Sequence, residues 1–251
     1  MFNPFSLEGK TILITGASSG IGRQCAIDCS KIGAKVVLVA RNQQRLDETL
    51  SLMEREGHRT YSYDLEQLAG IKDLITQIVA ENGKLDGFIH AAGIEKTAPV
   101  KLLTVEDYDA VYKTNCLSAF EIMKNLGLKQ INAEASIIFI ASISGVIART
   151  GLAAYSASKG ALISASKVMA LEFAKRKIRV NTVSPGTILT PMMEKALDEM
   201  PEEDRVKRVE GFPLGLGQTT DISNACIYLL SDAAKWVTGQ NLIVDGGYTC
   251  R

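Results

Sequence analysis

The side chains of this sequence best suited to moving a proton are Tyr155 and Lys159, which lie four positions apart. In a helix this spacing places both on one face, with Cβ atoms about 6 Å apart. A phenol is a poor base at neutral pH, because its ordinary pKa is about 10. A neighbouring ammonium stabilises the phenolate, so we expect Lys159 to lower the pKa of Tyr155 and allow proton exchange. The same pair also occurs by chance on helix surfaces and needs support from other residues.

Two polar residues stand where they could complete such a site. Ser142 follows the apolar run 137–141, and the carboxyl end of a strand is where an open α/β sheet binds its ligand. Its hydroxyl would hold and polarise a substrate oxygen beside the phenol. Asn115 lies within a predicted helix, where an amide side chain bonds to the backbone and distorts the turn. Each of the two also has a purely structural interpretation.

A glycine-rich loop, residues 15–22, follows the first predicted strand and leads directly into a helix. Glycines let the backbone approach a pyrophosphate closely, and the free N–H groups of the helix start favour negative charge. The spacing is G-x-x-x-G-x-G instead of G-x-G-x-x-G, so a turn without a ligand is the alternative. Its position at the start of an alternating domain favours a dinucleotide site. The expected contacts are Gly16, Ser18, Ser19, Gly20, Ile21 and Gly22.

The end of the second predicted strand indicates which dinucleotide binds. NAD-binding sheets usually place Asp or Glu there, where it bonds the ribose 2′-hydroxyl. This chain has Arg41 and Asn42 instead. A guanidinium can hold a 2′-phosphate with two parallel bonds. We therefore expect NADP(H), the alternative being that Arg41 is an ordinary surface residue.

The elements that would position these residues alternate between short apolar runs and longer helical periods. Strands are predicted at 11–15, 35–40, 60–63, 88–91, 137–142, 180–184 and 242–245. Helices are predicted around 21–32, from a capping box at Thr104 and Asp107 onward, at 155–175 and around 222–229. Nearly continuous apolar strands alternating with helices predict a Rossmann-type, doubly wound parallel α/β sheet. No linker or repeat divides the chain, so residues 1–251 are expected to form one domain.

The composition is that of a soluble globular protein, with 46% hydrophobic and 22% charged residues. Lys plus Arg and Asp plus Glu both number 28, so no overall basic field would hold nucleic acid or a membrane surface. Residues 1–10 lack a leader pattern, and no apolar run is long enough to span a bilayer. Five scattered cysteines and only two histidines suggest buried free thiols in a reducing cytoplasm, with no metal site.

Taken together, these motifs resemble the short-chain dehydrogenase/reductase family over essentially the whole chain. The residues that carry the resemblance are the glycine loop, Asn115, Ser142, the Tyr155–Lys159 pair, Asn181-x-x-Ser184-Pro185-Gly186 and Val244-Asp245-Gly246-Gly247. In this family an Asn-Ser-Tyr-Lys tetrad is catalytic. The resemblance implies that Tyr155 is the acid or base and that Ser142 anchors the substrate. It also implies that Lys159 grips the nicotinamide ribose and that Asn115 holds a proton-relay water.

The resemblance implies further cofactor contacts along the chain. They are Asp64 at the adenine with Leu65 beside it, the backbone of Ala91, Ala92 and Gly93, and Pro185, Gly186, Ile188 and Thr190 at the carboxamide end. One segment departs from the family, which usually has Asn-Asn-Ala-Gly where this chain has His90-Ala91-Ala92-Gly93. His90 is interpreted as a packed or hydrogen-bonded residue near the cofactor, with a catalytic base as the alternative.

The substrate is not determined by these motifs. Residues 191–216 lie where the family has a mobile lid and mix Met, Leu and Phe with a charged run, which suits either an apolar substrate or packing onto the body. The pattern is most similar to 3-oxoacyl-thioester reductases, with sugar, polyol or steroid dehydrogenases and a non-catalytic NADP(H)-binding regulator as alternatives. An enoyl reductase is a further alternative, but enoyl reductases of this fold usually separate Tyr and Lys by seven positions, whereas here the two residues are four apart. The family also implies a homo-oligomer, a dimer or tetramer.

Overall fold

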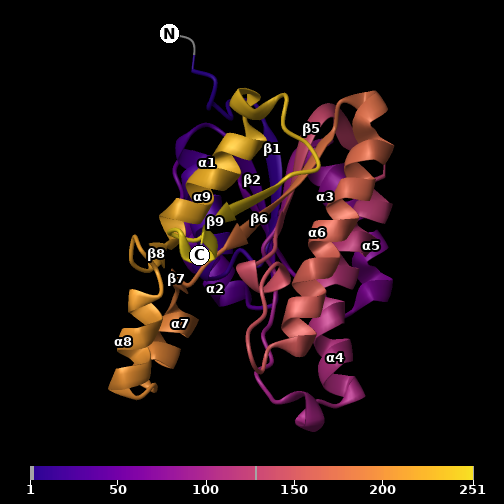
Figure 1. Ribbon diagram of the computed structural model, residues 1–251. Coiled ribbons are helices and arrows are strands. Elements are labelled where there is room, and N and C mark those ends of the chain that lie inside the picture. Colours follow the sequence, from indigo (N-terminus) through magenta and orange to yellow (C-terminus); the bar gives the residue numbers. More distant parts are fainter. Residues whose placement is uncertain (1–2, 128, 251) are drawn as a thin grey trace.

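A sheet of seven parallel strands forms the centre of the computed structural model, which describes residues 3–127 and 129–250 (Figure 1). The strand order is β3-β2-β1-β4-β5-β6-β9, and every adjacent pair is parallel. The strands are β1 Thr11–Thr15, β2 Lys35–Ala40, β3 Arg59–Ser62, β4 Leu85–His90, β5 Ile131–Ile140, β6 Arg179–Pro185 and β9 Asn241–Val244. This is the predicted Rossmann-type sheet in a single domain. Residues 1–2, 128 and 251 of the predicted range lie outside the described residues.

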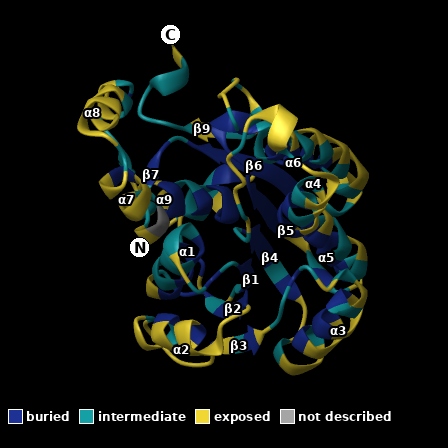
Figure 2. Cartoon of the chain, turned by 90° about the horizontal axis from the view of Figure 1, so that it is seen from below, coloured by how far each residue is buried: buried dark blue, intermediate teal, exposed yellow. Residues whose placement is uncertain are grey.

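Helices cover both faces of this sheet, as Figure 1 shows. On one face α1 (Gly20–Lys31) packs against α9 (Thr219–Leu230), and α2 (Gln43–Ser51) lies against β2 and β3. The other face carries α3 (Ile71–Asn82), α4 (Val105–Tyr112), α5 (Ser118–Leu126) and α6 (Ala153–Phe173). Each interface is a separate apolar core, and the inner strands β1, β2, β4 and β6 are almost entirely buried (Figure 2). Burial on both faces explains why the strands read as continuous apolar runs.

The periodic positions of α1 confirm the sequence interpretation of its cysteines. Cys25 and Cys29 are both buried, on the face that meets Cys226 of α9. Cys116 is also buried, and all five cysteines are free, with only Cys250 exposed. Thiols in such apolar surroundings behave as small hydrophobic residues.

Several boundaries differ from the prediction. β5 begins at Ile131, six residues early, and ends at Ile140, so Ser142 lies in the turn beyond the strand. The predicted capping box is confirmed: Thr104 Oγ1 accepts from Asp107 N, and the Asp107 carboxylate accepts from Thr104 N. Helices α2 and α3 were not predicted. The helix propensity of their residues was not sufficient to indicate them, and packing of their apolar faces onto the sheet stabilises them.

A small appendage extends from the carboxyl ends of β6 and β9. It contains β7 (Ile188–Leu189), α7 (Pro191–Asp198), α8 (Glu202–Glu210) and β8 (Gly217–Gln218), and Figure 1 shows α7 and α8 projecting from the body. It corresponds to the segment 191–216 singled out in the sequence. Across the described ranges, no helix has the length and apolarity needed to cross a membrane.

Gly22 packs so closely against the backbone of Gly16 that a larger side chain has no room there. A Cβ added at Gly22 would lie 2.7 Å from the carbonyl carbon of Gly16, which is backbone and cannot swing away. Gly22→Ala should therefore lower the free energy of unfolding by about 1–3 kcal/mol. As a matched control, a Cβ at Gly160 in α6 would lie 3.6 Å from Gly145 O, an ordinary contact. Gly160→Ala should leave the melting temperature unchanged or raised. Equal effects of the two substitutions in thermal unfolding would contradict the close approach.

Candidate active site

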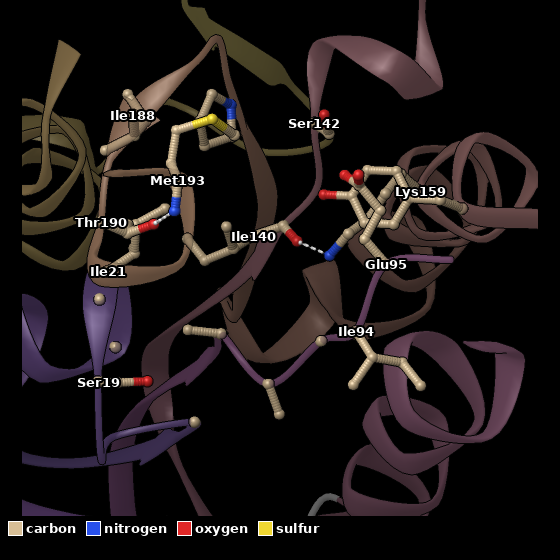
Figure 3. Close-up of a pocket in the computed structure, with 18 of the residues that line it drawn as sticks. Ser19, Ile21, Ile94, Glu95, Ile140, Ser142, Lys159, Ile188, Thr190 and Met193 are labelled. Atoms are coloured by element: carbon tan, nitrogen blue, oxygen red, sulfur yellow. Dashed lines mark hydrogen bonds between the residues drawn. The ribbon is translucent and has the colours of Figure 1, made fainter. Parts of the chain in front are cut away.

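A cavity of about 840 Å³ opens at the carboxyl ends of β1, β4, β5 and β6, and it gathers nearly all of the predicted site residues. It lies where the strand order reverses between β1 and β4, the usual ligand position in an open α/β sheet. The predicted residues that line it are Gly16, Ser18, Ser19, Gly20, Ile21, Gly22, Arg41, Asp64, Leu65, Ala91, Ala92, Gly93, Ser142, Tyr155, Lys159, Pro185, Gly186, Ile188 and Thr190. Asn115 is fully buried behind the wall. Figure 3 shows Ser19, Ile21 and Thr190 towards one end, and Ser142, Lys159 and Glu95 towards the other.

The glycine loop is shaped as a cradle for an anion. Gly16 has φ +67°, a left-handed conformation, and a Cβ there would lie 2.7 Å from Ala92 N. The loop therefore packs directly on the segment after β4 and leaves its backbone facing the cavity. Helix α1 begins at Gly20 with no acidic side chain in its first turn, and the Ser19 side chain does not cap it. Its first N–H groups remain available to a negatively charged ligand.

Arg41 lines the cavity directly after β2, with Asn42 and Arg45 beside it. Its side chain is 63% exposed, and its Nη1 lies 3.8 Å from Glu66 Oε1. An exposed ion pair at this distance contributes little. The guanidinium is thus free to turn towards a bound phosphate. Arg45 was missed in the sequence, where only its position in the first turn of α2 could have indicated it.

Tyr155 and Lys159 lie on one face of α6, as their spacing predicts. The Lys159 Nζ is 5.5 Å from the centre of the Tyr155 ring. It donates a hydrogen bond of 2.8 Å to the carbonyl of Ile140, the last residue of β5 (Figure 3). This bond ties α6 to the end of β5, where Ser142 follows. The three side chains expected to act on the substrate are therefore held at one end of the cavity.

The expectation that Lys159 lowers the pKa of Tyr155 is wrong. The pKa of Tyr155 is raised to about 12, first by burial and second by the negative charge of Glu95, while the Ser142 hydroxyl opposes the shift. Burial lowers the pKa of Lys159 to about 8. The ammonium faces the Ile140 carbonyl, so it does not dominate the phenol. At neutral pH Tyr155 is protonated, ready to donate a proton.

Asn115 distorts its helix, as expected for an amide at that position. Residues Lys113–Leu117 form a π-helical turn between α4 and α5, a feature frequent at functional sites. The Asn115 side chain is fully engaged. Its oxygen accepts from Ile94 N, and its nitrogen donates to Ile94 O and to Ser158 Oγ. It thereby fixes the segment after Gly93 to α6, and no donor of the amide is left for a water.

His90 is a buried strand residue, in agreement with the non-catalytic interpretation. Its Nδ1 lies 2.9 Å from Thr15 Oγ1, which joins β4 to β1 across the base of the cavity. Burial, with the charge of Lys159 second, lowers its pKa to about 3, although the backbone near Thr114 and Asn115 opposes the shift. The imidazole is neutral at physiological pH.

The structure adds several charged residues to this cavity that the sequence did not reveal, Glu66 and Lys207 among them. Glu95 follows β4, Arg149 lies in the loop before α6, and Arg208 lies on α8. Glu95, two positions after Gly93, could have been noticed from its nearness to the motif. The two arginines carry no local signal, because only the fold brings their loops to the cavity.

The shifted pKa of His90 predicts how stability depends on pH. As the pH falls below 6.5, the unfolded chain binds a proton at this residue, whereas the folded protein binds it only near pH 3. The free energy of unfolding should therefore fall by about 1.4 kcal/mol per pH unit in this window from this group. Urea unfolding of wild type and His90→Asn across the window measures it. The variant should lose stability less steeply; parallel curves would show that the imidazole titrates normally.

The chain is similar to known enzymes along almost its whole length. A family model described as enoyl-(acyl carrier protein) reductase matches residues 16–249. D-threitol dehydrogenase of Mycolicibacterium smegmatis is 33% identical over 98% of this chain and 95% of its own. The 3-oxoacyl-[acyl-carrier-protein] reductase of Thermotoga maritima is 34% identical over 96% of this chain and 98% of its own. The structure of a candidate 2-deoxy-D-gluconate 3-dehydrogenase of Agrobacterium tumefaciens, with bound NADP, has a TM-score of 0.89 at 32% identity and covers 100% of both chains.

The parallel sheet and the cavity at its carboxyl edge therefore agree with the similarity of nearly the whole chain to these enzymes. The protein belongs to the short-chain dehydrogenase/reductase family and is an oxidoreductase that acts on an alcohol or a ketone.

Proposed function

We propose that the protein uses NADP(H) to interconvert a ketone and a secondary alcohol, with Tyr155 as the proton donor or acceptor. The observation that carries the proposal is one shared cavity: the glycine loop, Ser142, Tyr155 and Lys159 all line it. An anion cradle and a proton donor are thus joined by continuous space. A redox reaction at a carbonyl carbon needs both.

The residues that line the cavity from the glycine loop to Arg41 and Asp64 fit a dinucleotide. The glycine loop would take the pyrophosphate, and Asp64 with Leu65 would contact the adenine. Arg41, with Arg45 nearby, would hold a 2′-phosphate, and no carboxylate ends β2 to repel it. The relative solved with bound NADP supports this choice. When bound, the nicotinamide supplies or accepts the hydride.

The chain's own residues then handle the substrate oxygen and its proton. Ser142 Oγ, which accepts from Ser144 N, can donate a hydrogen bond to the substrate oxygen. Tyr155, protonated at neutral pH, gives a proton to that oxygen as a ketone is reduced. In the oxidation direction it must first lose its proton, which its raised pKa disfavours. A protonated Tyr155 therefore suits reduction near neutral pH.

Alternatives with other chemistry are less well supported by this cavity. A non-catalytic regulator would not need a Tyr–Lys pair with a buried lysine at the end of the cofactor cavity. The Tyr and Lys are four positions apart, which favours carbonyl reduction over enoyl reduction despite the description of the matching family model. The relatives include a polyol dehydrogenase and an acyl-thioester reductase, so the family alone does not select the substrate.

Three further expectations belong to this proposal. Residues 191–216 act as a lid, since Met193, Arg208 and Phe212 from this segment line the cavity. Buried free thiols suit the reducing cytoplasm. A homo-oligomer would bury exposed apolar residues such as Val105, Val168 and Leu171 on α4 and α6. Light scattering in solution tests the last point directly.

Tyr155→Phe tests the central step. The variant keeps the ring and loses the proton, so kcat should fall by a factor of about 100 to 10,000. NADPH binding, followed by its fluorescence, should be unchanged within a few fold. In the wild type, reduction should stay level between pH 6 and 8 while oxidation rises with pH, because the pKa of Tyr155 lies near 12. Full activity in Tyr155→Phe would remove this residue from the mechanism.

Arg41→Ala tests the choice of cofactor. Loss of the guanidinium should lower kcat/KM for NADPH by about 10- to 100-fold, because a charge-assisted contact to phosphate disappears. The value for NADH should hardly change. Arg59→Ala is a matched control on the neighbouring strand β3, since Arg59 does not line the cavity. A wild type that uses NADH as well as NADPH would refute the assignment.

A further inference from the structure

Three charged side chains at the Tyr155 end of the cavity have no part in the proton transfer described above. They are Glu95 after β4, Arg149 before α6 and Arg208 on α8. Their loops are remote from one another in the sequence, and only this cavity brings them together. Figure 3 shows Glu95 at the same end as Ser142 and Lys159.

Arg208 is poorly satisfied within the chain. Its Nε is buried and has no hydrogen-bond partner in the described part of the protein. Its Nη2 donates a single long bond of 3.4 Å, to Thr187 Oγ1. A half-buried guanidinium whose buried Nε has no partner is costly. Its planar donors match a carboxylate or a phosphate, which would satisfy them in pairs.

The neighbouring cations differ from Arg208 in having acidic partners, Lys207 of the same cavity among them. Lys195, Arg205 and Lys207 of α7 and α8 each have a carboxylate within 4.0 Å, on the same helix or at its end. Within residues 3–127 and 129–250, neither Arg149 nor Arg208 takes part in an ion pair. The two arginines that line the substrate end are therefore the ones left for a ligand.

The local charge balance also favours an anion. Burial lowers the pKa of Arg208, the charge of Arg149 lowers it further, and Glu95 opposes both. Glu95 can offset one guanidinium, and its Oε1 already accepts from Thr97 Oγ1. Two guanidinium groups against one carboxylate leave a net positive charge. A single anionic group on the substrate would balance it.

Glu95 has a second neighbour that suggests its own role. Its side chain lies beside Lys159 in the cavity (Figure 3), and its charge raises the pKa of Tyr155. A carboxylate in that place can accept a hydrogen bond from a hydroxyl beside the reacting carbon. It has no comparable use for an unsubstituted acyl chain.

We propose that the substrate is a hydroxylated compound with a carboxylate or phosphate group, bound by Arg149 and Arg208, with Glu95 accepting from a substrate hydroxyl. This specificity rests on the proposed function, because it requires the carbonyl carbon to lie beside Tyr155. It selects acidic sugar derivatives over neutral polyols and over acyl thioesters.

Four ketones and NADPH test the proposal: a keto-aldonate, a ketose phosphate, the uncharged ketose of the same chain length and an uncharged 3-oxoacyl thioester. The wild type should reduce one of the two anionic sugars with a kcat/KM at least about tenfold above both uncharged compounds. Which of the two anionic sugars is reduced tells whether the arginines bind a carboxylate or a phosphate. The KM for the anionic sugar should also rise with ionic strength.

Arg208→Gln should lower the ratio of kcat/KM for the anionic over the uncharged ketose by about 10- to 100-fold. Arg208→Lys, which keeps the charge, should recover part of that ratio. Arg149→Gln, on an exposed loop, gives an independent test should α8 tolerate change poorly. Arg205→Gln is the matched control on α8 and should leave the ratio unchanged.

The outcomes separate this inference from the function on which it rests. Preference for the uncharged ketose or the thioester overturns the anionic substrate and leaves the reductase standing. The anionic substrate is likewise refuted if Arg208→Gln and Arg149→Gln change the ratio no more than Arg205→Gln. Turnover of none of the four compounds, with NADPH binding intact by fluorescence, overturns the proposed function itself.

Discussion

The hydrogen bond from the Lys159 ammonium to the carbonyl of Ile140 holds the whole site in place. Lys159 is 4% exposed, and a buried ammonium must be paired to be tolerated. The bond fixes the start of α6 to the end of β5, so that Tyr155 and Ser142 meet. Burial lowers the pKa of Lys159 to about 8, which places its proton close to the physiological range.

Charged side chains are distributed unevenly around the cavity, although the chain as a whole has zero formal charge. The start of α1 and Arg41 provide positive potential at one end, and Arg149 with Arg208 provide it at the other. The charge of Glu95 acts both on the Tyr155 phenol and on Arg208. Overall composition excluded a broad basic surface, but it could not reveal charges that are concentrated inside one cavity.

The site also shows how one altered motif is accommodated. His90 replaces the usual asparagine, and its bond to Thr15 joins β4 to β1. The Asn115 side chain bonds the backbone N–H and the carbonyl of Ile94, and it donates a hydrogen bond to Ser158 of α6. The strand ends, the π-helical turn and α6 are thereby fixed to one another. Rigid positioning of this kind is what a hydride transfer between two bound molecules requires.

Local patterns in the sequence were sufficient to predict the parallel sheet, the glycine loop and the shared face of Tyr155 and Lys159. Apolar runs specify buried strands, and i, i+4 neighbours meet on any helix. The boundaries of β5, the helices α2 and α3, and the raised pKa of Tyr155 depend instead on how the elements pack together. So does the meeting of Arg149 with Arg208. Burial and charge proximity arise between segments far apart in the chain, and no pattern within a short window encodes them.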